Sequence, residues 1–176
     1  MKNKIFATLL ALTLALSLTV LAGCSNGGSK TSDKTPEELT QLYSDALTAN
    51  GGELVEYNPV ITEVSEENPL SSVALENMGL TQEDMTAFAI STSMMNVKAY
   101  GIAAVMPAEG KEEAVTEALQ GYIDRQQQSF ETYLADQYEV AKNARLETLE
   151  DGTVLMVMCE GQDTIFDGIS SSILEA

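Results

Sequence analysis

The chain has 176 residues, of which 27 are acidic and 9 are basic, and it contains no histidine, so its formal net charge is −18. Because an acidic field repels phosphate backbones and no basic patch interrupts it, nucleic-acid binding is excluded. The lack of histidine also excludes His-based catalytic triads and His-ligated zinc or copper.

The first 24 residues have the pattern of a secretion signal that ends at a lipidation site. Lys2 and Lys4 precede an almost wholly apolar segment, residues 5–20. Its length suits a signal sequence, since a membrane span needs about 20 apolar residues and basic flanks of its own. The following Leu21-Ala22-Gly23-Cys24 resembles a bacterial lipobox. The resemblance implies cleavage before Cys24 and a diacylglyceryl thioether on its sulfur; the alternative is an ordinary secretory peptide with a chance cysteine.

Removal of a signal peptide at residues 1–23 leaves 153 residues, enough for one domain with a hydrophobic core. We predict a flexible tether over residues 24–35, spanning roughly 18 Å as a coil, and a single globular domain over residues 36–176. Loss of two signal lysines changes the net charge from −18 to −20, so the lipid on Cys24 would have to provide the membrane attachment. The predicted location is the extracytoplasmic face of the cell membrane.

The domain is expected to begin with a helix. Thr35 is a good N-cap, Pro36 suits the first helical position, and Glu38 completes a capping box ahead of an apolar stripe. Further on, residues 54–57 and 60–64 suggest short strands, and residues 71–78 suggest a short helix that ends at Gly79.

From residue 86 the order strand-strand-helix is predicted twice. Residues 86–94 and 100–106 form a first hairpin, and a long helix follows over residues 110–134. Asp151-Gly152 predicts a two-residue type I′ turn that sets Leu146 opposite Val157, and Asp163 is expected to cap a closing helix. The predicted fold class is α+β: one four-stranded antiparallel sheet from two hairpins, with helices mainly on one face and an N-terminal helix before them.

No catalytic, cofactor or metal site is predicted. Cys159 ends an apolar run and is expected to be a small buried hydrophobe. The methionines are expected to fill the core, with an adaptable partner groove or a soft-metal site as alternatives. Five glutamates could together provide oxygen ligands for calcium, but they are more simply interpreted as a solvated face. They are Glu53, Glu56, Glu63, Glu66 and Glu67.

Two groups of residues resemble a family of uncharacterised acidic lipoproteins of Gram-positive bacteria. One is Ser93-Met94-Met95-Asn96-Val97, a turn ahead of a strand and a long helix. The other lies near the end of that helix and comprises Phe130, Tyr133, Leu134, Asp136, Gln137 and Tyr138. The resemblance covers roughly residues 37–175. It implies an extracytoplasmic domain of unknown function and carries no substrate, cofactor or catalytic residue.

The expected function is a non-enzymatic binding or accessory module with a protein partner at the membrane surface. The expected contact surface is the Met94-Met95-Asn96 turn with the adjoining end of the long helix, which bears Gln126, Gln127, Gln128, Phe130 and Tyr133. The alternative is that Met94, Phe130 and Tyr133 are core and the glutamines are solvated. Two other functions stay open: a small-solute-binding lipoprotein of a transporter, and an enzyme that uses carboxylates alone.

Overall fold

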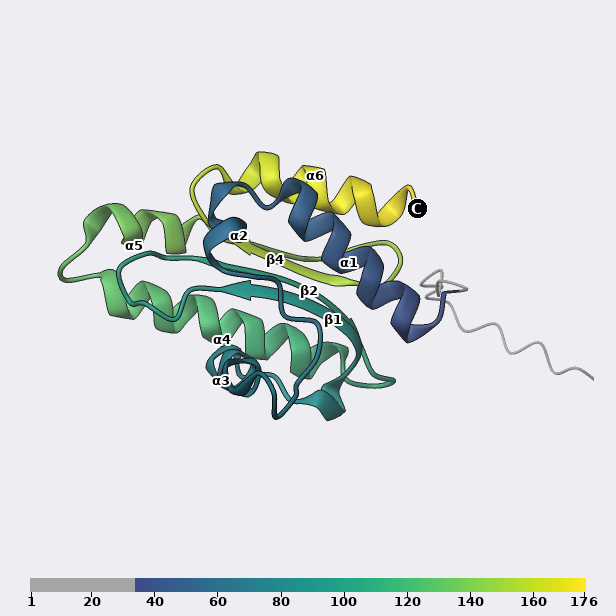
Figure 1. The fold of residues 1–176 in the computed structure, drawn as a ribbon. Coiled ribbons are helices and arrows are strands. Elements are labelled where there is room, and N and C mark those ends of the chain that lie inside the picture. Colours follow the sequence, from purple (N-terminus) through teal and green to yellow (C-terminus); the bar gives the residue numbers. More distant parts are fainter. Residues whose placement is uncertain (1–33) are drawn as a thin grey trace, which may run out of the picture.

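The computed structural model describes residues 34–176, in which a four-stranded antiparallel sheet lies between helices (Figure 1). The strands are β1 (Met85–Thr92), β2 (Gly101–Pro107), β3 (Arg145–Thr148) and β4 (Val154–Met158). The helices are α1 (Pro36–Asn50), α2 (Glu53–Tyr57), α3 (Pro69–Met78), the 3-10 helix η1 (Gln82–Asp84), α4 (Glu112–Phe130), α5 (Ala135–Lys142) and α6 (Gln162–Leu174). The sheet order β1-β2-β4-β3 confirms the predicted α+β class and its two hairpins.

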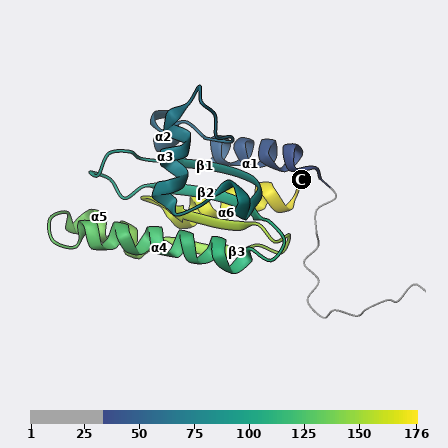
Figure 2. The ribbon, with the colours of Figure 1, turned by 90° about the horizontal axis from the view of Figure 1, so that it is seen from below.

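Helices cover both faces of the sheet, so the expectation that they pack mainly on one face is wrong. Phe88 and Ile90 of β1 point into a core that contains α3 and α4, whereas Ala87 and Ala89 point into a second core that contains α1 and α6. Figure 1 shows α1 and α6 on one side of the strands, and Figure 2 shows α3 and α4 across the other. The physical reason is that every residue of β4 is buried, and a strand with two apolar faces needs cover on both.

The N-terminal helix begins as the sequence predicts. The backbone N–H of Glu38 donates to Thr35 Oγ1, and the backbone N–H of Thr35 donates to Glu38 Oε2, which is the expected capping box. Behind it, Leu39, Tyr43 and Leu47 are buried against the sheet and α6. The helix therefore serves as one wall of the second core.

The segment between α1 and β1 differs from its prediction. Residues 53–57 form the helix α2 instead of a strand, because only Val55 in this turn is buried and Tyr57 is 76% exposed. In the second expected strand only Ile61 pairs, as an antiparallel bridge to Ile90 at the edge of β1. The predicted helix near residues 71–78 is confirmed as α3 and ends at Gly79.

The β3–β4 hairpin has a three-residue loop where a two-residue turn was expected. The N–H of Leu149 donates to the carbonyl of Thr153, and Gly152, with φ of 93°, occupies the left-handed position that ends such loops. The register is therefore shifted by one residue, and Leu146 pairs with Met156 instead of Val157. This shift turns Arg145 toward α6, where its guanidinium carbon lies 3.8 Å from the ring centroid of Phe166.

The C-terminal helices also begin and end at residues other than those expected. The helix predicted over residues 110–134 stops at Phe130, and the separate helix α5 follows it. Gly161 occupies the N-cap position of α6, so Asp163 lies in the first turn and does not cap the helix.

Candidate functional site

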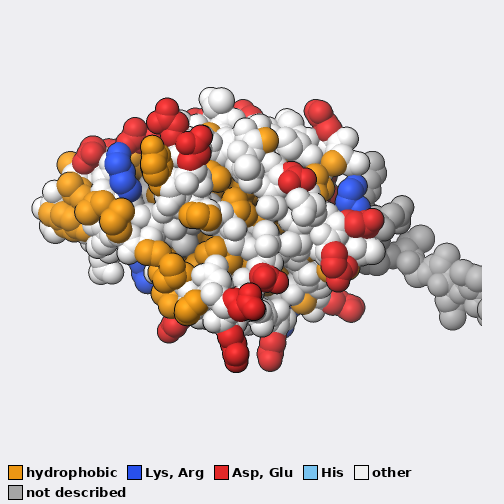
Figure 3. All heavy atoms as spheres, in the orientation of Figure 1, with side chains coloured by type: hydrophobic (Ala, Val, Ile, Leu, Met, Phe, Trp, Pro, Cys, Tyr) orange, Lys and Arg blue, Asp and Glu red, His pale blue; other side chains and the backbone are white. Residues whose placement is uncertain are grey.

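The loop between β1 and β2 exposes an unusual amount of apolar surface. In residues 93–98, here called the methionine loop, the exposed fractions are 46% for Met94, 69% for Met95 and 58% for Val97. Tyr133, after α4, is 54% exposed beside them. Figure 3 shows hydrophobic side chains gathered at this end of the molecule. Contiguous exposed apolar side chains, unlike scattered ones, are typical of interaction sites.

The backbone of the methionine loop is held in place by hydrogen bonds. Ser93 Oγ accepts from the N–H of Met95 at 3.2 Å, and the hydroxyl of Tyr133 donates to the carbonyl of Asn96 at 3.2 Å. At the end of the loop, the N–H of Ala99 donates to Oε1 of the buried Gln137 at 2.9 Å. The loop is therefore anchored through its backbone, and the side chains of Met94 and Met95 remain free for contact.

Buried tyrosines fix the strand ends below the loop. The hydroxyl of Tyr122 donates to the carbonyl of Tyr100 at 2.9 Å and accepts from Thr92 Oγ1 at 3.0 Å. Burial raises the pKa of Tyr122 and raises that of Tyr100 to about 12. These hydroxyls stay protonated at neutral pH, so they act as structural donors and not as acid–base groups.

A groove of about 560 Å³ lies beside the methionine loop and opens to solvent. The loop forms one wall, α4 contributes Arg125, Gln126 and Ser129, and α3 contributes its exposed surface. Arg125 crosses from α4 to α3, where its Nη2 donates to the carbonyl of Asn77 at 2.8 Å. Apolar, amide and charged groups thus surround one depression, a mixture that suits binding more than bond-breaking chemistry.

The expected contact surface is present in part. Met94 and Tyr133 are exposed, so the core alternative is wrong for them, but it is correct for Phe130, which is fully buried. Met95 is exposed as well. Gln126 lines the groove, whereas Gln127 and Gln128 line a separate depression on α4. Gln137 belongs to the residues that carry the family resemblance, but its hydrogen bond to Ala99 was not predicted, because a single buried glutamine in a short helix forms no apolar pattern.

In the described part of the chain, the remaining residues singled out from the sequence do not contribute to this site. Cys24 lies outside the described residues. Cys159 is buried as expected, and burial raises its pKa to about 11, which keeps the thiol protonated. Met78, Met85, Met156 and Met158 are buried in the core. Within residues 34–176, Glu53 and the other acidic residues form no cluster that would hold a metal ion.

The geometry so far is that of an α+β domain with an exposed, backbone-anchored apolar loop. Residues 63–159 match the model of a family described as a domain of unknown function (DUF4358), and the chain belongs to this family. The match includes the sheet, α3, α4, α5 and the methionine loop. No curated protein and no solved structure matches the chain. In the described part of the chain, every helix is too short or too polar to cross a bilayer.

Proposed function

We propose that the protein is a lipid-anchored, extracytoplasmic module that binds a protein partner through the methionine loop and has no enzymatic activity of its own. The observation that carries this proposal is the combination of an anchored backbone with exposed Met94, Met95 and Val97. Methionine side chains are flexible and polarizable, so they adapt to apolar partner surfaces at low cost.

The position of the loop supports a partner in the extracytoplasmic space. In Figure 1, α1 begins at one end of the domain and the β1–β2 loop lies at the other. The 19 residues of α4 run along this direction and extend about 28 Å at 1.5 Å per residue. A lipid on Cys24 would keep the start of α1 within the length of the flexible tether from the bilayer, and the methionine loop would lie at the end of the domain farther from the attachment point.

The anchor is tested on the protein extracted from membranes. Mass spectrometry should show an N-terminal Cys24 that carries added acyl groups, among them palmitate. The variant Cys24→Ser should lose the added mass and leave the membrane fraction. A mature N-terminus elsewhere without lipid would contradict the proposed location.

The partner is tested by crosslinking in intact cells. A photoreactive residue at position 95 should yield one dominant crosslinked protein, and the same residue at position 174 in α6, where Leu174 is also exposed, should not. The double variant Met94→Ser/Met95→Ser should lose co-purification of that protein, while Leu174→Ser should keep it. Equal loss in both variants would show that exposed apolar area in general, and not this loop, is responsible.

A solute-binding lipoprotein of a transporter is a second candidate, favoured by the groove. Its volume of about 560 Å³ lies within the range of about 300–1,000 Å³ for small-molecule sites. A rise of several degrees in Tm with one solute, lost in Gln126→Ala and without any crosslinked partner, would replace the proposed function by this one.

A further inference from the structure

We propose that the open edge of β1 beside α1 binds an extended, basic segment of a partner protein, which adds a fifth strand to the sheet. This site lies apart from the methionine loop, and the inference does not depend on the function proposed for that loop.

The edge of β1 is only partly paired. The N–H of Ile61 donates to the carbonyl of Ile90 at 2.7 Å, and the N–H of Ile90 donates to the carbonyl of Ile61 at 2.9 Å. Because backbone groups alternate along a strand, Phe88 presents its N–H and C=O to the same outer edge as Ile90. Among the described residues, neither group of Phe88 has a hydrogen-bond partner. Unpaired edge groups of this kind are templates for another strand.

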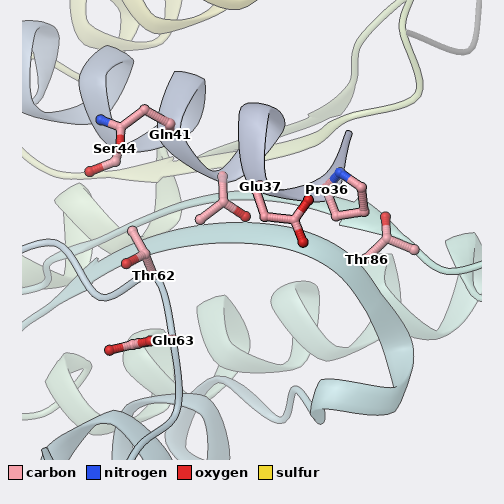
Figure 4. A pocket seen from close by; sticks show the side chains of 8 residues that line it. Pro36, Glu37, Gln41, Ser44, Thr62, Glu63 and Thr86 are labelled. Carbon is pink, nitrogen blue, oxygen red and sulfur yellow. The ribbon is translucent and has the colours of Figure 1, made fainter. Parts of the chain in front are cut away.

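Residues 34–176, the part of the chain that the structure describes, leave this edge open beyond the bridge at Ile61. After that bridge the described chain forms no further bridge to this edge of β1, and Figure 4 shows the segment with Thr62 and Glu63 leaving the strand. A groove of about 350 Å³ occupies the space, with α1 as its upper wall. The available stretch is short, since the bridge at Ile90 limits it on one side and a bulge between Met85 and Ala87 on the other.

The two glutamates that line the groove favour a basic segment as its occupant. Glu37 on α1 and Glu63 lie on opposite sides of the β1 ribbon (Figure 4), and none of the described residues that line the groove is a lysine or an arginine. Side chains of an added strand point alternately to the two faces of the sheet. A segment with basic residues therefore places one of them toward Glu37 or toward Glu63, while its backbone pairs with Phe88. Main-chain bonds supply the affinity and these charges supply the selectivity.

The probe is a capped decapeptide of alternating lysine and threonine, added to the full-length protein in detergent. Backbone amide exchange is followed by NMR. The peptide should slow exchange at Phe88, whereas a glutamate–threonine peptide should not. A lysine–threonine peptide with every second backbone nitrogen methylated should also fail, because it lacks the N–H groups that pair with an edge.

Charge-reversal variants locate the site. Glu37→Lys and Glu63→Lys should each weaken peptide binding about two- to fivefold, the effect of an exposed ion pair. The matched control is Glu113→Lys in α4, which makes the same change of net charge elsewhere and should leave binding unchanged. The variant Met94→Ser/Met95→Ser should also bind normally, which separates this site from the methionine loop.

Several results would overturn the proposal. Equal weakening by Glu113→Lys would show attraction to the acidic surface as a whole. Tight binding of the methylated peptide, or peptide-induced changes that avoid Phe88, would exclude strand addition at this edge. Slow exchange at Phe88 in the free protein would show that the chain or a second copy already covers it. The absence of binding at millimolar peptide would also count against the site.

Discussion

The hydroxyl of Tyr43 lies 2.7 Å from Oγ1 of Thr153 and joins α1 to the start of β4 across 110 positions of sequence. Thr153 gives its own proton to Oδ2 of Asp151 at 2.8 Å, so Tyr43 is the donor in this pair. Both residues are fully buried. Tyr43 lies outside the residues matched by the family model, yet it is bonded to Thr153, which lies inside them and directly precedes β4. The folded unit is therefore larger than the matched region.

The variant Tyr43→Phe should lower the free energy of unfolding by about 0.5–1.5 kcal/mol, since it removes one net hydrogen bond from a buried site. Urea denaturation monitored by circular dichroism measures the change. Tyr57→Phe removes the hydroxyl of a largely exposed tyrosine and should have no measurable effect. If the two variants were equally stable, the bond between α1 and β4 would contribute nothing.

A protein cut to the matched region, residues 63–159, should fail to fold. Without α1 and α6, one face of the sheet would expose Ala87, Ile102, Leu155 and Val157 to water, and an apolar sheet face is unstable when uncovered. We expect aggregation or a featureless circular dichroism spectrum, and cooperative unfolding of residues 34–176. A monomeric, cooperatively unfolding 63–159 fragment would contradict the two-core description.

Acid should remove a stabilising contact at the start of β1. Hydrogen bonds from Lys111 and Thr81 lower the pKa of Asp84, and Lys111 Nζ lies 2.9 Å from Oδ1. A carboxyl group whose pKa is lowered in the folded state stabilises the protein at pH values above its pKa in the unfolded chain, which is about 3.9. That contribution is lost as the pH falls through the lowered folded value.

The urea concentration at the unfolding midpoint should therefore be higher for the wild type than for Asp84→Asn near pH 6. This difference should vanish at lower pH. Lys111→Met removes the ionic partner of Asp84 and should shrink the difference that is measured near pH 6. A gap between wild type and Asp84→Asn that grows toward low pH would have the wrong sign for this interaction.

Two glycine-to-alanine substitutions should have opposite effects. A Cβ on Gly101 would lie 2.8 Å from Cε1 of Tyr122, whose hydroxyl is fixed by two hydrogen bonds, so Gly101→Ala should destabilise by about 1–3 kcal/mol. Gly121 is inside α4, and its added Cβ would approach only the flexible end of Arg125 at 3.2 Å. Gly121→Ala should therefore stabilise by about 0.5–1 kcal/mol. Thermal unfolding of both variants tests the pair, and a loss of stability in Gly121→Ala would show that Arg125 cannot move aside.

Features that depend on neighbouring residues were predictable from the sequence. The capping box at Thr35 and Glu38 is one example, and the apolar stripe behind it is another. The boundary of the candidate site was harder to predict. Alternation along β1 continues formally to Met94, so the sequence pattern alone does not show that the strand ends at Thr92 and leaves Met94 in solvent.

Features that depend on tertiary contacts were missed. Asp151-Gly152 is compatible with two-residue and three-residue loops, and a shift of one residue moves every side chain of β3 to the other face. The helix α5 begins without a side-chain cap, and its buried residues are Gln137 and Ala141, which give too short an apolar pattern to recognise. The helices α1 and α6 cover the second face of the sheet because β4 is apolar on both sides. The need for this cover arises only when the sheet has formed.

The sheet order and the two helix layers together determine how the halves of the domain are related. Each half runs strand, strand, helix, but α4 lies on one face of the sheet and α6 on the other. A two-fold rotation that brings the first hairpin onto the second keeps each face of the sheet in place, so it carries α4 to the face opposite α6. The two units therefore have opposite hand, and no rotation superposes them. Their similar order is therefore not a structural repeat, and the residues of each half determine a different packing of its helix.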